Sequence, residues 1–97
     1  MIYHVVTKDK WQRSLEAGSY EPESLAIEGF IHASGETQVA GVLQRYYNEP
    51  AELLLLHIDE SKLMAELRYE YSRSLDENFP HIYGRLNIDA VVKVTPI

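Results

Sequence analysis

Two short segments of the chain combine ring-bearing polar residues with glycine. Residues 79–84 read Phe-Pro-His-Ile-Tyr-Gly, so an imidazole, His81, stands two residues before a phenol, Tyr83. The proline fixes φ near one end and the glycine relaxes it at the other, which predicts a loop that presents both rings. Residues 29–34, Gly-Phe-Ile-His-Ala-Ser, repeat the combination around His32. Together the two segments indicate a pocket for a polar organic ligand.

Strand parity adds further candidates to this pocket. Alternation along a short strand at 30–33 places His32 and Ser34 on one face, with the intervening residues on the core face. If the first strand is its neighbour, His4 would meet His32 across the sheet. Glu70, in a later alternating strand, could enter the same cleft. A carboxylate beside imidazoles suits ribose binding or acid–base chemistry.

Each candidate also has a structural interpretation. His4 could be a structural histidine whose ring is fully hydrogen-bonded, and Ser34 could cap the helix that follows it. Glu70 could pair with Arg68 or another cation on a solvent-exposed face. The histidine and tyrosine of residues 79–84 are least well explained by packing, although a buried hydrogen bond between them is an alternative.

The composition limits the class of protein. The chain has 97 residues, 45% hydrophobic and 25% charged, which fits a single folded domain spanning 1–97. A net charge of −6 without any basic run argues against binding to a DNA or RNA backbone. The absence of cysteine excludes disulfides, thiolate metal sites and cysteine nucleophiles. The longest apolar run, Leu53 to Leu56, is too short to cross a membrane, and the N-terminus has no signal-peptide pattern. We therefore expect a cytoplasmic protein; the sequence leaves its oligomeric state open, with a monomer slightly favoured.

The predicted elements alternate between strands and helices. We expect strands at 2–6, 30–33, 52–58, 67–71 and 90–94, helices at 7–18 and 36–46, and loops at 19–25 and 72–78. Thr7 should cap the first helix and Gly18 close it, while residues 48–50 should end the second. The continuous apolar strand at 52–58 should be central and covered on both faces. This order indicates an α+β domain with a mixed β-sheet and two main helices.

The apolar positions of the two helices should face the core. In the first helix these are Trp11 and Leu15, four residues apart; in the second they are Val39, Val42, Leu43 and Tyr46.

Several local motifs of known chemistry are missing from the sequence. It contains no G-x-G-x-x-G, no phosphate-binding P-loop, no H-E-x-x-H and no G-x-S-x-G. The four histidines are widely spaced, so no local metal-ligand motif is present and we predict no metal site.

Taken together, the motifs resemble a known family. They are Ile-Tyr-His at 2–4, tryptophan at 11, Gly-x-Tyr-x-Pro-x-Ser-Leu at 18–25, Glu-Gly-Phe-Ile-His-Ala-Ser at 28–34, Tyr-Glu at 69–70 and Phe-Pro-His-Ile-Tyr-Gly-x-Leu-Asn at 79–87. Over nearly its whole length the chain is similar to the small bacterial family catalogued as domain of unknown function 952. That family is grouped by distant similarity with ADP-ribosyltransferase-like folds. The resemblance implies a small split β-sheet that grips NAD, as a substrate, in a central cleft.

The resemblance also implies roles for individual residues. His4 would bind ribose, and His32 with Ser34 would line the nicotinamide side. Glu70 would contact the ribose near the reacting carbon. Cleavage of the glycosidic bond builds positive charge on the ribose ring, and a carboxylate in a low-dielectric cleft would stabilise it.

A bound diphosphate would also need a nearby cation. Arg85, which follows the second ring-bearing segment, is preferred for this role over Arg68 and Arg73. His81 and Tyr83, in the same segment as Arg85, would add ligand contacts.

Three functions therefore stay open from the sequence. The first is an enzyme of the ADP-ribosyltransferase-like class that acts on NAD or an ADP-ribose-like nucleotide. The second is a non-catalytic module that binds a small ligand in the same cleft. The third is a structural or protein-interaction module whose histidines only fix loops.

Overall fold

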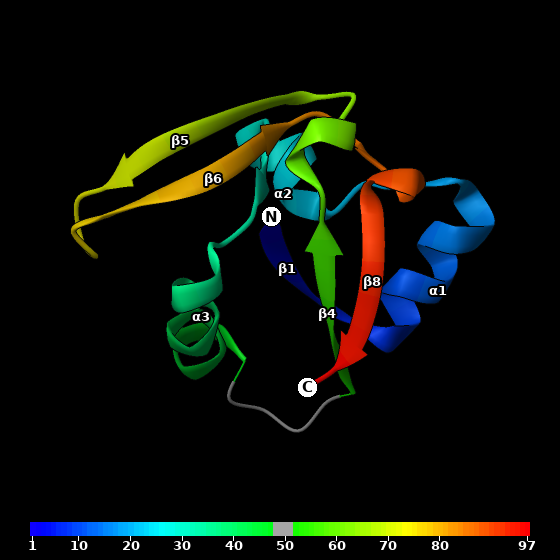
Figure 1. Cartoon of the computed structure of the whole chain (residues 1–97), viewed down its shortest axis with the longest axis horizontal. Coiled ribbons are helices and arrows are strands. Elements are labelled where there is room, and N and C mark those ends of the chain that lie inside the picture. Colours follow the sequence, from blue (N-terminus) through cyan, green and yellow to red (C-terminus); the bar gives the residue numbers. More distant parts are fainter. Residues whose placement is uncertain (48–51) are drawn as a thin grey trace.

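The computed structural model describes residues 1–47 and 52–97, which form a small α+β fold (Figure 1). Its elements in chain order are β1 (Ile2–Thr7), α1 (Lys8–Ala17), β2 (Ser19–Tyr20), α2 (Glu23–Glu28), β3 (Ile31–His32), η1 (Glu36–Gln38), α3 (Val39–Tyr46), β4 (Leu53–Ile58), η2 (Glu60–Lys62), β5 (Glu66–Ser72), β6 (Glu77–Tyr83), β7 (Leu86–Asn87), η3 (Ile88–Ala90) and β8 (Val91–Pro96). The strands form three small sheets, ordered β1-β4-β8, β2-β7 and β3-β6-β5. All pairings between described strands are antiparallel, so the prediction of a mixed sheet is wrong.

The first sheet confirms the central strand that the sequence predicts. β4 lies between β1 and β8, because its apolar run can be paired along both edges. Leu56 and Ile58 are completely buried, whereas Leu55 and His57, on the opposite face, are half-buried. The expectation that both faces are covered is therefore only partly met, and the core lies on the side of Leu56.

Helix α1 has the predicted ends. The Thr7 side chain accepts a hydrogen bond from the Lys10 amide at 3.2 Å, and Gly18 ends the helix with φ +88°, a conformation that favours glycine. Trp11 is buried as predicted. The prediction that Leu15 faces the core is wrong, since Leu15 is 50% exposed. The second buried residue of α1, beside Trp11, is Ser14. The hydroxyl of Ser14 tolerates burial because it donates to a backbone carbonyl one turn earlier, at 2.9 Å.

The predicted loop at 19–25 instead contains two elements. Ser19 and Tyr20 pair with Asn87 and Leu86, and α2 begins directly after Pro22. Proline suits the start of a helix, where its missing N–H has no partner to lose. The chain therefore has a third α-helix, where the sequence predicted two main helices.

The two ring-bearing segments lie in strands. Residues 79–84 were predicted as a loop, but β6 runs from Glu77 to Tyr83 and continues the hairpin that starts in β5. The predicted loop at 72–78 shrinks to the hairpin turn, with Asp76 at φ +53°. Pro80 fits inside β6 because its backbone groups face away from β5, so the β5–β6 ladder takes no N–H from it, and its carbonyl accepts from the Ala33 amide at 3.0 Å.

The second predicted helix forms as η1 followed by α3. Its start differs from the prediction: Ser34 does not cap it, because the Ser34 backbone exchanges two hydrogen bonds of 2.8 Å with Tyr3. Gly35 is the cap, and its amide donates to the Gln38 side chain at 2.8 Å. Tyr46, predicted on the apolar stripe, is 66% exposed. The predicted helix break at 48–50 lies outside the described residues.

One core joins all three sheets. Its buried residues are Ile2, Val6, Trp11, Tyr20, Ile31, Ala33, Leu56, Ile58, Ile82, Leu86 and Ala90. The β5–β6 hairpin runs across one end of this body, with β5 on the outer side of β6 (Figure 1). No helix among the described residues is long and apolar enough to cross a membrane.

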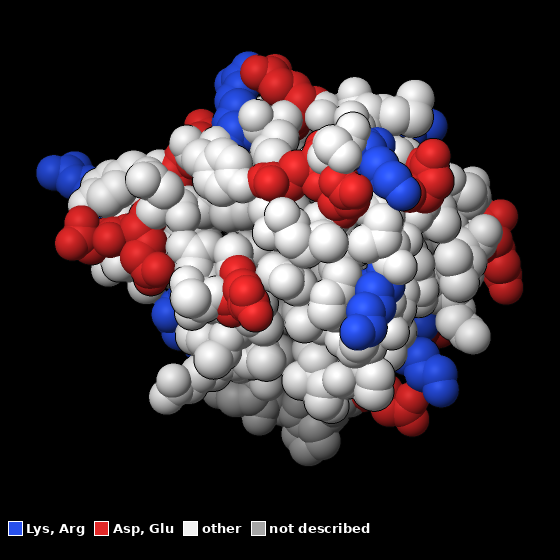
Figure 2. Space-filling view, viewed as in Figure 1, with Lys and Arg blue, Asp and Glu red and all other residues white. Residues whose placement is uncertain are grey.

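Acidic residues outnumber basic ones over the whole chain. On the face shown in Figure 2, the Lys and Arg side chains lie apart and alternate with Asp and Glu. This face therefore presents no continuous basic surface.

Candidate functional site

One face of the β3-β6-β5 sheet gathers the predicted imidazoles and the carboxylate. His32 lies opposite His81 in the ladder, and Ile31 lies opposite Ile82. Opposite residues share a face, so the two histidines stand on one side of the sheet and the two fully buried isoleucines on the core side. Glu70, on β5, shares the side of the histidines, because its partner in β6 is two residues from His81. The parity predicted for the strand at 30–33 is confirmed.

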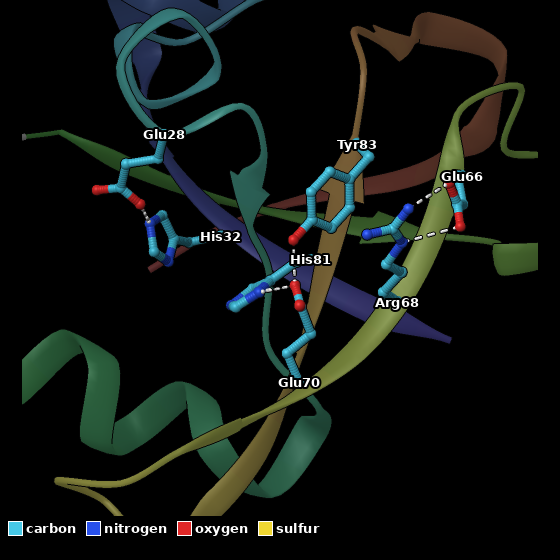
Figure 3. A network of polar contacts seen from close by, with 7 residues as sticks. All are labelled: Glu28, His32, Glu66, Arg68, Glu70, His81 and Tyr83. Carbon is cyan, nitrogen blue, oxygen red and sulfur yellow. Dashed lines mark hydrogen bonds and ion pairs between the residues drawn. The ribbon is translucent and has the colours of Figure 1, made fainter.

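The Glu70 carboxylate joins an imidazole and a phenol. Its Oε1 accepts a hydrogen bond from His81 Nδ1 at 2.8 Å and a second, short one from the Tyr83 hydroxyl. Figure 3 shows the carboxylate between the two rings, with the His81 ring extending from it toward His32. The His81 side chain is only 15% exposed, and that of Glu70 is 39% exposed. The three groups therefore form a connected network at the edge of the solvent.

Proton positions in this network follow from its chemistry. The hydrogen bonds from Tyr83 and then from His81 lower the pKa of Glu70, so its carboxylate is ionised near neutral pH and can only accept. The same contact with Glu70 raises the pKa of Tyr83, which keeps its proton. His81 must therefore carry hydrogen on Nδ1. In the neutral imidazole, Nε2 then has a free lone pair.

Aromatic contacts fix the orientation of His81. The Phe30 ring stacks on it, with centroids 4.1 Å apart and an angle of 20° between the planes. His32 meets His81 edge-on, with a centroid distance of 5.3 Å. The His32 ring is itself held by Glu28, whose Oε2 lies 2.5 Å from Nε2. The imidazoles of His32 and His81 thus each have one nitrogen hydrogen-bonded to a carboxylate, and neighbouring rings set their positions.

Arg68 stabilises the far side of the network. Its guanidinium lies 4.4 Å from the centroid of the Tyr83 ring, a cation–π contact. It also donates to both oxygens of Glu66, at 2.8 and 3.1 Å (Figure 3). The alternative that Glu70 pairs with Arg68 is therefore wrong, because Glu66 is the direct partner of Arg68.

A hollow of about 650 Å³ opens beside the two histidines. A volume of this size is typical of small-molecule sites. Its walls mix aromatic, apolar and polar side chains: His4, Val5, Glu28, His32, Ala33, Ser34, Val42, Arg45, Tyr46, Tyr47, Tyr71, Ser72, Leu75, Phe79 and His81. Four of the seven predicted site residues are in this wall, namely His4, His32, Ser34 and His81.

His4 lies in the wall but is already fully hydrogen-bonded. Its Nδ1 lies 2.6 Å from the carbonyl oxygen of His32, and its Nε2 lies 2.8 Å from the Tyr20 hydroxyl. A carbonyl only accepts, so Nδ1 carries the proton, and Nε2 accepts from the phenol while the ring is neutral. Burial lowers the pKa of His4 to about 4, which keeps the ring neutral near pH 7. These contacts match the structural interpretation of His4, and the expected meeting with His32 occurs through the His32 backbone.

Three predicted site residues lie outside the wall of the hollow. Glu70 and Tyr83 lie behind His81 and reach the hollow only through it. Arg85 is elsewhere: its Nε is 3.1 Å from Glu21, and its side chain is 71% exposed. The structure therefore brings the two ring-bearing segments together but does not place Arg85 beside them.

Sequence reasoning missed several residues of the wall. Glu28 precedes His32 by four residues, a spacing that brings side chains together on a helix and could have indicated this pair. The helix ends at Glu28, however, so the pair is not a helical one. Arg45, in the last turn of α3, is the cation of the wall. Tyr71 and Phe79 reach the hollow from opposite strands of the hairpin, and only the long-range pairing of β5 with β6 brings them together.

Within residues 1–47 and 52–97, no three His, Asp or Glu side chains gather closely enough to hold a metal ion.

Comparison with known proteins places the chain in a family. The family described as "Protein of unknown function (DUF952)" matches residues 5–94. The chain belongs to this family. The assignment agrees with the resemblance carried by the sequence motifs, and it brings no activity with it. Among curated proteins, none matches this chain.

Solved structures of one similar protein share the fold. The crystal structure of protein CC0527 from Caulobacter crescentus is 27% identical, with a TM-score of 0.89 over 98% of this chain and 83% of that chain. The solution NMR structure of CC0527 is also 27% identical, with a TM-score of 0.81 over 97% of this chain and 81% of that chain. These structures describe the same α+β architecture in the relative.

Proposed function

We propose that this DUF952 protein binds a small nucleotide-type ligand of the NAD or ADP-ribose class in the hollow beside His81. The observation that supports the proposal most directly is His81 Nε2, which has no hydrogen-bond partner among residues 1–47 and 52–97, on a ring held at the wall by the contact of Nδ1 with Glu70. An imidazole fixed in this way can bond a ribose hydroxyl or exchange a proton with it, since its tautomer and direction are set in advance.

The composition of the wall fits such a ligand. Tyr46, Tyr47 and Tyr71 present flat rings with hydroxyl groups, which suit the faces of a heterocycle and the edge of a sugar. Ser34 adds a buried hydroxyl at the wall. Arg45 is the group that would meet a phosphate, in the place that the sequence assigned to Arg85.

In this proposal Glu70 is a positioning residue. The resemblance implied that it touches the ribose directly, but its Oε1 already accepts from His81 and Tyr83. A carboxylate that accepts from Nδ1 holds the His81 ring in one tautomer and one direction, with Nε2 as the nitrogen left to meet a ligand. If the protein is an enzyme, glycosyl transfer from NAD would therefore use His81 as the group that takes or gives the proton.

Titration calorimetry with NAD, ADP-ribose, AMP and adenosine tests the proposal. We expect heat of binding for at least one nucleotide at ligand concentrations up to about 1 mM, and about a tenfold loss of affinity in His81→Gln. His57→Gln is the matched control. It removes a ring that bonds Thr95 at 2.9 Å, and His57 is not part of the wall. Absence of binding by all four ligands, or equal loss in both variants, would overturn the proposal.

Glu70→Gln separates binding from catalysis. A glutamine keeps the size of the side chain but removes the charge that orients His81. A pure binding module should lose little affinity and show no turnover of NAD before or after the change. An enzyme should release nicotinamide, detectable by chromatography, and Glu70→Gln should lower kcat more than it raises KM.

A further inference from the structure

Strand β5 forms an open edge of the β3-β6-β5 sheet. It pairs with β6 along one side, and no backbone hydrogen bond joins its other side to any described residue. Figure 1 shows β5 as the outermost strand of the hairpin. Tyr69 and Tyr71, in the middle and second half of the strand, are 57% and 61% exposed. An open edge with exposed aromatic side chains is a template for pairing with another strand.

The position of Pro80 shows which backbone groups point outward. Antiparallel ladders alternate between residue pairs that exchange two hydrogen bonds and pairs that exchange none. Tyr69 lies opposite Pro80, which has no N–H and whose carbonyl accepts from Ala33 on the other side. The N–H and C=O of Tyr69 therefore point away from β6. By alternation, those of Leu67 and Tyr71 do the same.

We propose that β5 pairs with β5 of a second copy of this chain, antiparallel and with a two-fold axis through Tyr69. Tyr69 is the midpoint of the strand, which runs from Glu66 to Ser72. Pairing about this residue therefore uses the whole strand. The outward N–H and C=O of Tyr69 would bond the same groups of its copy, and Leu67 would exchange hydrogen bonds with the partner subunit's Tyr71.

The side chains are complementary in this register. Arg68 falls opposite the partner subunit's Glu70, and by symmetry Glu70 falls opposite the partner subunit's Arg68. These are non-hydrogen-bonded pairs, in which side chains approach most closely, so opposite charges attract there. A two-fold axis through Arg68 would also pair the outward backbone groups of Leu67 and Tyr69, but it would place Glu66 opposite the partner subunit's Glu70. It would also place two arginines together.

Glu70 has an oxygen available for this contact. Its Oε1 serves His81 and Tyr83, whereas Oε2 has no hydrogen bond to any described residue. Arg68 in the free chain is held by Glu66, so pairing would exchange that exposed contact for one with the partner. The dimer would thereby bring a cation to the carboxylate that orients His81. This inference replaces the expectation of a monomer and does not depend on which ligand the hollow takes.

Two charge reversals test the register. The two strands bury little surface, so we expect a weak dimer, seen by analytical ultracentrifugation as a rise in mean mass between about 10 μM and about 1 mM. Arg68→Glu and Glu70→Arg should each weaken self-association about tenfold or more, because each change places like charges opposite one another twice. An equimolar mixture of the two variants should associate again, since both cross-strand pairs then have opposite charges.

Controls make each outcome decisive. Arg85→Glu reverses a charge away from β5 and should leave association unchanged, while circular dichroism checks that every variant folds. If a reversal fails to fold, Tyr69→Pro replaces it. Proline removes an outward N–H that β6 does not use, so this variant should be monomeric. A wild-type mass that stays monomeric to about 1 mM, or variants that associate as tightly as wild type, would overturn the proposal.

Hydrogen exchange gives a second measurement without any substitution. With rising protein concentration, the amide of Tyr69 should become protected, because only the dimer supplies it with an acceptor. The amides of Arg68 and Glu70 bond β6 in both states, so their exchange should not change. Equal concentration dependence of all three amides would refute the register.

Discussion

Acid should destabilise this protein through His4. In the folded chain the ring lies between the carbonyl of His32 and the hydroxyl of Tyr20, and burial lowers its pKa to about 4. In the unfolded chain the ring is in water and has the ordinary value of 6.5. The unfolded state therefore binds more protons between these values. Stability is fully present above pH 6.5 and is lost as the pH falls toward 4.

The two pKa values set the size of the effect. One pKa unit corresponds to about 1.4 kcal/mol, so a fall from 6.5 to about 4 amounts to about 3 kcal/mol once both states are protonated. At pH 5 about 2 kcal/mol of this should already be lost. A small domain has a total stability on the order of 10 kcal/mol, so the loss should be visible as a lower urea midpoint.

Urea unfolding at several pH values measures this loss. The single tryptophan, Trp11, is buried and reports unfolding by fluorescence. Carboxylates with lowered pKa, Glu70 among them, also lose stability in acid, so the informative quantity is the difference between wild type and His4→Gln. The variant lacks the titrating ring, and its free energy of unfolding should fall about 2 kcal/mol less than that of wild type between pH 7 and pH 5.

His57→Gln is the matched control, because it removes a histidine whose ring bonds Thr95 in the same sheet. Its pH dependence shows how much of any change comes from removing a histidine from this sheet rather than from His4. If the free energy of unfolding of wild type and of His4→Gln changed equally with pH, the reasoning would be refuted, because His4 would then take up no extra proton on unfolding.

Three further changes have measurable outcomes. In Tyr83→Phe the largest cause of the lowered Glu70 pKa is removed, so the carboxyl should titrate at higher pH in carbon-13 NMR. Gly84 has φ +154°, and in Gly84→Ala the new Cβ would lie 2.9 Å from Cβ of Ala65. The free energy of unfolding, measured by thermal unfolding, should therefore fall by about 1–3 kcal/mol. In Leu56→Ala, truncation of a completely buried side chain should lower the free energy of unfolding, measured in urea, by about 2–5 kcal/mol.

Each of these changes has its own comparison. Tyr69→Phe removes a phenol that bonds Glu60, and should leave the Glu70 titration in place. Gly35→Ala has φ −75° and a nearest neighbour at 3.5 Å, so it should be nearly neutral. Leu15→Ala trims a side chain that is 50% exposed. An unchanged pKa of Glu70 in Tyr83→Phe would contradict the first argument. Equal losses of stability in Gly84→Ala and Gly35→Ala, or in Leu56→Ala and Leu15→Ala, would contradict the second or the third.

The features that the sequence predicted well are local. The cap at Thr7 and the left-handed end at Gly18 depend on residues within one helix, and both are confirmed. The faces of His32 and Glu70 follow from alternation within single strands, because side-chain direction in a strand depends only on parity. Parity thus places both residues on one side of the sheet once the strands are paired.

The features that the sequence could not predict depend on pairing over long distances. Pro80 and Gly84 indicated a loop, but β6 accommodates the proline because β3, about fifty residues earlier, supplies Ala33 on one edge. Contacts with Leu86 and Asn87 likewise convert part of the predicted loop at 19–25 into strand β2. Local propensity carries no information about such partners.

The same limit applies to Glu70, to which the family resemblance assigned a direct contact with ribose. Sequence position alone marks it as a carboxylate on the same face as His32, free to meet a ribose. The hairpin places both His81 and Tyr83 within reach of one of its oxygens, and an oxygen that accepts two hydrogen bonds is a poor partner for a third group. In the proposed function, chemistry in the hollow would then pass through Nε2 of His81, whereas the second Glu70 oxygen is left for a group that approaches the open edge of β5. The proposed dimer supplies that group as the partner subunit's Arg68, so one carboxylate would link self-association to the orientation of the candidate base.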